Sequence, residues 1–450
     1  MNEGKVCRKI LSVCLALLMV AALVPVQLIS VSAASNTAYI YRWWDSGENL
    51  VKSETRYADA DKLQDFNNDL EDLNAGWYYS SSYKVFDKRV TIHGTVNIII
   101  CEAGGSYVEF ADGIHVTPGN TLNIYGQENE TQALKAVAGT NDQAAIGGNS
   151  GEAGGTVNIY SGKVEADSYT NGDDAAGIGG GKNGGGGTVN IFGGTVTAKG
   201  ANSSYDGGAG IGCGDSGSGG TVKIYGGTVN ATGGHDGAGI GGGDDGSSGT
   251  ISIYGGDVTA NGNCAAGIGG GEYGESGIIS IYGGKVTATG GTDAAGIGGG
   301  DEKAGGTINI YDGNVTASGG SCAAGIGGGD NGSSGDIVIR GGTIHANGTA
   351  ESSDGGAGIG GGESADGGSI TINGGNVTAT GGTFAAGIGG GFDNSCGSIT
   401  INNTVTQVTA SRGADAPYSI GAGYGGSGGA VTIGGTEGSI SESPYTYQPN

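Results

Sequence analysis

The sequence is poor in proline, histidine and basic residues, and each shortage excludes a class of protein. It has 5 Pro, 4 His and 19 Lys or Arg among 450 residues, against 44 Asp or Glu. Because proline is scarce and glycine does not recur at every third residue, the 105 glycines do not indicate collagen. The net charge of −25 repels phosphate backbones, so we expect no nucleic-acid partner.

Familiar catalytic and metal-binding motifs are also missing. No Cys-x-x-Cys pair, His-Glu-x-x-His pair or phosphate-binding P-loop occurs, and the four histidines are scattered. Parallel β-helices do include polysaccharide lyases and hydrolases, so an enzyme of that class stays an alternative. The sequence favours a protein that is not an enzyme.

Residues 1–34 have the features of a signal peptide. Lys5, Arg8 and Lys9 form a positive start, an apolar run covers residues 10–23, and Val31-Ser32-Ala33-Ala34 is a small-x-small cleavage pattern. The sequence therefore predicts a secreted or cell-surface protein with no membrane span after cleavage.

Residues 35–89 differ from the rest in being richer in aromatic and charged residues. Leu63, Phe66, Leu70 and Leu73 recur at helical spacing, which predicts a short helix on one apolar face. We interpret this segment as an N-terminal cap, because the open end of a stacked-strand structure exposes strand edges and core side chains.

Residues 90–436 consist of repeats marked by a sequence close to Ala-Ala-Gly-Ile-Gly-Gly-Gly. The marker isoleucines recur every 28 to 33 residues: Ile146, Ile178, Ile211, Ile240, Ile268, Ile297, Ile326, Ile359, Ile388 and Ile420. This period predicts an all-β fold, a single parallel β-helix (β-solenoid) of about ten coils, followed by a C-terminal tail at 437–450.

One repeat shows how a coil is built. The segments 250–254, 257–260 and 265–269 read as three short strands, and glycine pairs between them read as corners. Alternation places Ile251, Ile253, Val258 and Ala260 inward. A coil buries too few aliphatic side chains to fold alone, so stacking at about 4.8 Å per coil must create the core.

Five cysteines lie outside the predicted signal peptide, and two of them test the register. Cys264 and Cys322 each precede a marker isoleucine by four residues, and one further coil lies between theirs. Two coils span about 9.6 Å, which is beyond the reach of a disulfide.

The segments Gly94-Thr-Val-Asn-Ile98 and Asn120-Thr-Leu-Asn-Ile-Tyr-Gly-Gln127, followed by the marker repeats, resemble secreted parallel β-helix proteins of Gram-positive anaerobic bacteria. The resemblance covers residues 76–433. It implies a right-handed β-helix in an extracellular setting and a carbohydrate-binding role.

A column of aromatic residues is a candidate glycan-binding surface. Each follows the last inward residue of its first strand and should point outward, and the column contains Tyr125, Tyr160, Phe192, Tyr225, Tyr254, Tyr282 and Tyr311. Exposed rings can stack on sugars, and stacked rings can equally stabilise neighbouring coils.

A second column is acidic. It contains Asp215, Asp244, Glu272, Asp301, Asp330 and Glu363, each directly after a glycine corner. Carboxylates about 5 Å apart repel, so the column is either well hydrated or holds cations, with weak calcium binding as the specific hypothesis.

Together these features predict an extracellular or cell-surface, non-catalytic binding or adhesion module with a polysaccharide or surface glycan as its partner. The alternatives are a purely structural stalk or spacer and a polysaccharide-degrading enzyme. Accessible rings are needed for a binder, whereas a stalk needs only their stacking.

Overall fold

The computed structural model describes residues 37–449 except 67–69, 81, 102–106, 130–131, 140–141, 169–173, 203–205, 350–353 and 366. The predicted signal peptide lies outside these residues. Within the described part, no helix is long and apolar enough to cross a membrane.

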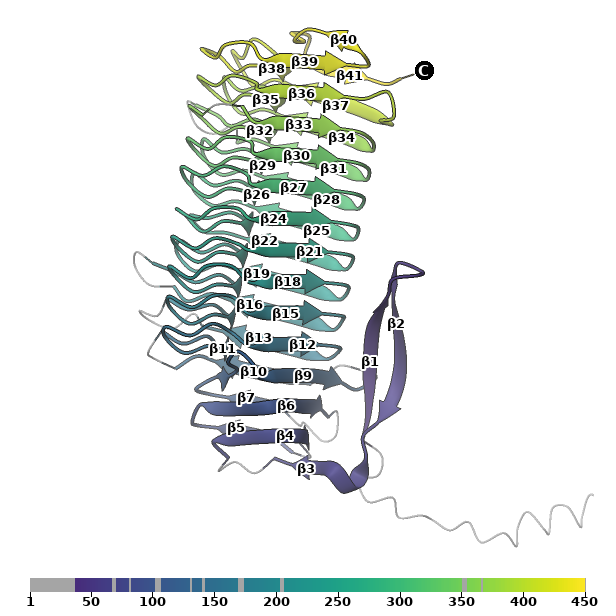
Figure 1. The fold of residues 1–450 in the computed structure, drawn as a ribbon, viewed down its shortest axis with the longest axis vertical. Coiled ribbons are helices and arrows are strands. Elements are labelled where there is room, and N and C mark those ends of the chain that lie inside the picture. The colour runs from purple at the N-terminus through teal and green to yellow at the C-terminus, as the bar shows by residue number, and fades with distance from the viewer. Residues whose placement is uncertain are drawn as a thin grey trace, which may run out of the picture.

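The chain forms a parallel β-solenoid of about eleven turns, with the coils stacked in chain order (Figure 1). The first strands of successive coils stack on one another; they are β4 (Asp72–Tyr79), β6 (Val90–Ile100), β9 (Thr121–Gly126), β12 (Thr156–Ile159), β15 (Thr188–Ile191), β18 (Thr221–Ile224), β21 (Thr250–Ile253), β24 (Ile278–Ile281), β27 (Thr307–Ile310), β30 (Asp336–Ile339), β33 (Ser369–Ile372), β36 (Ser398–Ile401) and β39 (Ala430–Ile433).

The second strands form a separate sheet: β5 (Lys84–Phe86), β7 (Val108–Phe110), β10 (Ala133–Val137), β13 (Lys163–Asp167), β16 (Thr195–Lys199), β19 (Thr228–Thr232), β22 (Asp257–Asn261), β25 (Lys285–Thr289), β28 (Asn314–Ser318), β31 (Thr343–Asn347), β34 (Asn376–Thr380) and β37 (Gln407–Ser411).

The marker residues form two-residue strands: β8 (Ile114–His115), β11 (Ile146–Gly147), β14 (Ile178–Gly179), β17 (Ile211–Gly212), β20 (Ile240–Gly241), β23 (Ile268–Gly269), β26 (Ile297–Gly298), β29 (Ile326–Gly327), β32 (Ile359–Gly360), β35 (Ile388–Gly389) and β38 (Ile420–Gly421).

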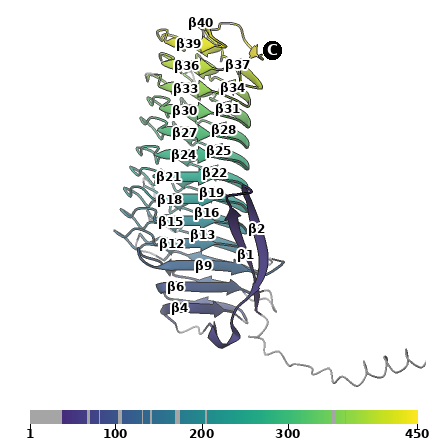
Figure 2. The same cartoon turned by 45° about the vertical axis from the view of Figure 1, so that its right-hand side comes forward.

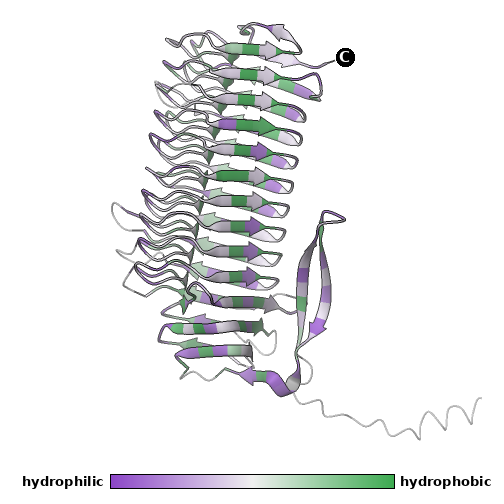
Figure 3. Ribbon diagram, viewed as in Figure 1, coloured by the Kyte–Doolittle hydropathy of each residue, from purple (hydrophilic) through white to green (hydrophobic). Residues whose placement is uncertain are grey.

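The predicted register is confirmed. Ile240 pairs with Ile268, Ile268 with Ile297, and Ile297 with Ile326. Cys264 and Cys322 therefore belong to coils two steps apart, as the spacing predicted. The inward residues of every coil join one continuous hydrophobic core from Phe66 to Ile433, and Figure 3 shows the alternation of apolar and polar residues along the strands.

The glycine after each marker isoleucine is required by both backbone conformation and close approach. Gly241 has a φ of 142°, and a Cβ there would lie 1.9 Å from the carbonyl oxygen of Gly269 in the next coil. Its equivalents behave alike along the stack, so glycine at this position permits the coils to approach to hydrogen-bonding distance.

The helix predicted in the N-terminal cap is wrong. Where the helix was expected, the described residues form a 3₁₀ turn, η2 (Ala60–Lys62), the strand β3 (Leu63–Asp65) and the start of β4, with which β3 pairs. Leu73 and Phe66 do close the core end, but Leu73 does so from an extended strand paired with β6. Hydrogen bonding to the strands of the first coils determines the conformation here, in spite of the helical spacing of the apolar residues. The solenoid therefore starts well before residue 90.

The rest of the cap is an antiparallel hairpin of β1 (Ala38–Asp45) and β2 (Leu50–Tyr57). It rises along the side of the solenoid instead of closing its end, as Figures 1 and 2 show from two directions.

The predicted C-terminal tail is also part of the fold. The strand β40 (Thr436–Glu437) pairs with β39, and β41 (Tyr445–Tyr447) pairs antiparallel with β37. Ile440, Tyr445 and Tyr447 pack against the core. The antiparallel return covers the edge that the last coil leaves unpaired.

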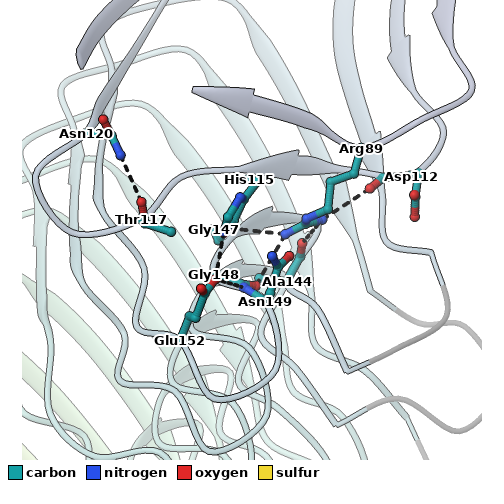
Figure 4. Close-up of polar contacts among 10 residues, drawn as sticks. All are labelled: Arg89, Asp112, His115, Thr117, Asn120, Ala144, Gly147, Gly148, Asn149 and Glu152. Atoms are coloured by element: carbon teal, nitrogen blue, oxygen red, sulfur yellow. Dashed lines mark hydrogen bonds and ion pairs between the residues drawn. The ribbon is translucent and has the colours of Figure 1, made fainter. Parts of the chain in front are cut away.

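Arg89 links the backbone turns at the first two marker strands, β8 and β11 (Figure 4). Its Nη1 donates to the carbonyl oxygens of Asp112 and Ala144 at 3.2 and 3.0 Å, and its Nη2 donates to those of Gly147 and Gly148 at 3.2 and 3.3 Å. Burial lowers the pKa of Arg89 to about 10, so the side chain stays charged at neutral pH. A buried guanidinium thus satisfies four backbone acceptors of two coils.

We expect Arg89→Met to lower the free energy of unfolding by about 3 kcal/mol or more, because four carbonyl groups lose a charged donor in a buried place. Urea denaturation followed by circular dichroism measures the change. The exposed Arg412→Met serves as control and should stay within about 0.5 kcal/mol of wild type. Equal midpoints for both variants would contradict the linking role of Arg89.

Candidate functional site

The aromatic column forms one continuous stack. Successive ring centroids from Tyr125 to Tyr311 are 4.6 to 4.9 Å apart with interplanar angles of 4 to 12°. All seven predicted residues are therefore brought together. Their faces, however, lie against one another, so the surface that the stack offers to other molecules consists of ring edges and phenol hydroxyls.

The β1–β2 hairpin covers the N-terminal part of this stack. Tyr39 contacts Tyr125 and Tyr41 contacts Tyr160, with ring centroids 4.7 and 5.0 Å apart. Trp44 contacts both Tyr225 and Tyr254, at 5.6 and 5.0 Å. Burial under the hairpin raises the pKa of Tyr125, which is only 5% exposed.

Polar contacts hold the hairpin in place. Ser161 Oγ donates to the Ile40 carbonyl oxygen at 2.5 Å, and Gln127 Nε2 donates to that of Ala38 at 2.9 Å. Arg42 passes so close to Gly193 that a Cβ there would lie 2.4 Å from Arg42 Cδ. The fit between hairpin and solenoid is therefore specific along its length.

The C-terminal end of the stack is uncovered. Tyr282 and Tyr311 are each 38% exposed. The guanidinium of Arg340 lies 4.7 Å from the Tyr311 ring centroid, and its Nη1 donates to Asn309 Oδ1 at 2.8 Å. Tyr282, Tyr311 and Arg340, together with Tyr254 at the edge of the hairpin, form what we call the open strip.

An asparagine ladder runs beside the aromatic stack and was missed in the sequence. Asn123 Nδ2 donates to Asn97 Oδ1 at 2.9 Å, and Asn158 and Asn190 continue the chain at 2.8 Å each. The recurring Thr-Val-Asn-Ile segments carried this signal, because equal residues at equal positions of parallel coils come into contact.

The acidic column lies where the marker segment folds back on itself. In the coils of Ile146 to Ile388 the residue two places before the marker isoleucine donates its backbone N–H to the carbonyl two places after it, as in Ala238 to Gly242 at 2.8 Å. This turn brings the residue four places before the isoleucine close to the column. Glu272 N, for example, donates to the Asp236 carbonyl oxygen at 3.0 Å.

The turn adds unpredicted residues to the acidic column. The preceding position holds Asp174, Asp236, Cys264, Asp293 and Cys322, and we call the two columns together the acidic groove. The sequence showed Asp293 and both cysteines at equivalent positions. What it did not show was that this position faces the acids.

The first part of the groove is balanced by a lysine. Lys182 Nζ lies 2.5 Å from Asp174 Oδ2, 3.5 Å from Asp215 Oδ2 and 3.8 Å from Asp206 Oδ2. These acids raise the pKa of Lys182 well above its usual range. Asp215, one of the predicted calcium ligands, is therefore part of an ion-pair network.

In the next coils carboxylates lie together, and no lysine of the described residues forms an ion pair with them. Carboxylate oxygens of Asp236, Asp244 and Glu272 lie within 4.8 Å of one another. Burial, followed by repulsion from Asp236, raises the pKa of Asp244 to about 8. Burial and a hydrogen bond with Asp236 raise that of Glu272 to about 7.

The groove changes character toward its C-terminal end. Cys322, Asp330 and Glu363 form another close group, and burial and the nearby Glu363 raise the pKa of Asp330 to about 6. Asp301 joins none of these groups among the described residues. Phe392 and Tyr424 take the acidic position in the last coils and pack with Phe384. Calcium binding by the predicted six acids stays a prediction.

Comparison with known families supports the repeat architecture. The family described as beta helix repeat matches residues 154–182, 189–215, 222–244, 251–272, 279–301, 308–330, 337–363 and 370–392. Each matched segment contains one marker strand and ends on a residue of the acidic position, from Lys182 to Phe392. The matches thus repeat in step with the stacked coils.

The chain is a parallel β-helix repeat protein. No curated protein and no solved structure matches it significantly.

The groove gives this β-helix an expected pH dependence. The folded-state pKa values of Asp244, Glu272 and Asp330 lie above those of unfolded carboxylates near 4, so the folded state binds the extra protons. The contribution of these protonated side chains to the stability of the folded state is fully present below about pH 4 and is lost as pH rises through about 6 to 8.

With chelator present, we therefore expect the melting temperature to fall between about pH 5.5 and 8.5. The triple change Asp244→Asn, Glu272→Gln and Asp330→Asn should flatten this slope, while Asp257→Asn, outside the groove, should leave it. Calorimetry at several pH values measures both. A triple variant with the wild-type slope would rule out these acids as its source.

Proposed function

We propose that this β-helix is an extracellular or cell-surface, non-catalytic binding module that contacts glycan chains through the open strip. The observation that carries the proposal is the partial cover of the aromatic stack: the hairpin reaches as far as Tyr254, whereas Tyr282 and Tyr311 stay 38% exposed beside Arg340. The predicted signal peptide supports the extracellular setting, and the resemblance stated above supports a carbohydrate ligand.

The contact we propose differs from sugar stacking on ring faces. The faces of Tyr254 and Tyr282 are occupied by neighbouring rings at 4.6 to 4.8 Å. Sugar hydroxyls would instead meet phenol hydroxyls, ring edges and the Arg340 guanidinium, all of which are polar or carry positive charge at the rim. Each such contact is weak, so a long polymer that spans several coils is the ligand class that fits.

The second candidate is a structural stalk, and the face-to-face stacking favours it. Seven rings in contact, an asparagine ladder and a continuous core all stiffen the rod without any ligand. The two candidates make different demands on the tyrosine hydroxyls: glycan binding uses them, whereas stacking does not.

A glycan array with the full chain identifies the ligand, and tyrosine-to-phenylalanine changes test the strip. We expect Tyr254→Phe, Tyr282→Phe and Tyr311→Phe together with Arg340→Gln to weaken binding at least tenfold, about 1.4 kcal/mol, while melting stays near wild type because the stack is kept. Surface plasmon resonance measures the affinity.

The matched control is Tyr125→Phe with Tyr160→Phe, under the hairpin, and it should bind as wild type does. If the open-strip variant binds the glycan equally well, or if no glycan binds to wild type, the stalk takes the place of the binding module.

A further inference from the structure

We propose that His235, Asp236, Cys264 and Glu272 form a binding site for a zinc-class divalent metal ion that clamps two neighbouring coils together. A ligand atom of His235, a carboxylate oxygen of Asp236 and the sulfur of Cys264 lie within 4.8 Å of one another. Asp236 also belongs to a second such group, in which its carboxylate lies within 4.8 Å of those of Asp244 and Glu272. The inference is independent of glycan binding.

Asp236 is the centre of this cluster. Its side chain is buried, with the residue only 4% exposed, and it interacts with all three other residues. His235 Nδ1 lies 2.5 Å from Asp236 Oδ1, and Cys264 and Glu272 both hydrogen-bond to the Asp236 carboxyl. Three groups that can each ligate a metal thus converge on the buried Asp236 carboxylate, which is itself a fourth potential ligand.

The negative charge of the buried Asp236 carboxylate requires a compensating cation. Buried carboxylates in proteins are paired with cations or bound to metals. Two coils earlier, the equivalent and equally buried Asp174 is paired with Lys182. Here the position equivalent to Lys182 holds Asp244, and no lysine or arginine of the described residues forms an ion pair with Asp236, Asp244 or Glu272.

The donor set favours zinc-class ions over calcium. Calcium binds six to eight oxygen atoms, whereas zinc takes four ligands from imidazole, thiolate and carboxylate. One nitrogen, one sulfur and two carboxylates match the second pattern. His235, whose side chain is 40% exposed, lies at the outer side of the cluster and leaves the ion a path from solvent.

The ligands come from two successive coils. His235 and Asp236 precede β20, whereas Cys264 precedes β23 and Glu272 follows it. The backbone already joins these positions, because Cys264 N donates to the His235 carbonyl oxygen at 2.8 Å. A bound ion would add a second link at the same corner, so metal binding should raise the melting temperature of the folded chain.

Cobalt(II) is the probe that tests the thiol. The full chain, reduced and freed of metal with chelator, should bind one equivalent and develop a thiolate-to-cobalt charge-transfer band in the near ultraviolet. Zinc should displace the cobalt and remove the band. Cys264→Ser should abolish the band, and His235→Ala should weaken cobalt binding by on the order of a hundredfold.

Two controls keep the test decisive. Cys396→Ser removes a core thiol, and Cys322→Ser removes the register-equivalent thiol, whose preceding coil has Thr292 in place of His235; both should retain the band. Circular dichroism confirms that each variant is folded. Persistence of the band in Cys264→Ser, its loss in Cys322→Ser, or binding of calcium but not zinc to wild type would overturn the assignment.

Discussion

The hydrogen bonds between successive coils are the interaction on which the rest of this structure depends. They pair equivalent residues directly, such as Ile251 with Ile279 and Val258 with Val286. Each outward side chain therefore meets the side chain at the same position of the next coil, at the spacing of neighbouring strands. For aromatic rings and amides this contact is favourable: seven rings stack from Tyr125 to Tyr311, and four asparagines are hydrogen-bonded from Asn97 to Asn190. For carboxylates this contact is unfavourable because their charges repel. The acidic groove reduces this repulsion in a different way in each of its parts.

The ways of reducing carboxylate repulsion change from the N-terminal to the C-terminal part of the groove. Lys182 balances the first acids, while burial and repulsion raise the pKa of Asp244 and Glu272 so that part of their charge is removed by protonation. In the last coils Phe392 and Tyr424 replace the acid altogether. A repeat constrains the backbone of every coil to the same path, but it leaves the side chain at an outward position free to change the local chemistry.

The coils could be predicted from the sequence because their information is local and repeated. The marker isoleucines gave the register, and alternation gave inward residues such as Ile253 and Val258. The cap could not be predicted in the same way. Its sequence is not repeated elsewhere in the chain. Its contacts are also distant in sequence, because the hydrogen bond between Ile40 and Ser161 joins residues that are 121 positions apart. The helical spacing of Leu63 to Leu73 had no competing strand signal until the pairing of β4 with β6 was seen.

The candidate sites were predicted in part for the same reason. Columns formed by one position of the repeat, such as the aromatic stack, are visible in the sequence. The groove combines two positions eight residues apart, and only the turn around the marker isoleucine shows that Asp236 and Asp244 face each other.

The hairpin divides the aromatic stack into two parts with different physical roles. Under the hairpin, Tyr125 is buried and its ring contacts add to the adhesion between cap and solenoid. Beyond Trp44 the same stack continues with its rim in solvent, where ring–ring contact already supplies its stability. Because stacking holds these rings without help from a ligand, the open strip is organised before anything binds, and little conformational entropy is lost when a polymer meets it. The same rigidity that suits a stalk therefore also lowers the cost of binding, which is why the tyrosine hydroxyls, and not the stability of the stack, distinguish the two roles.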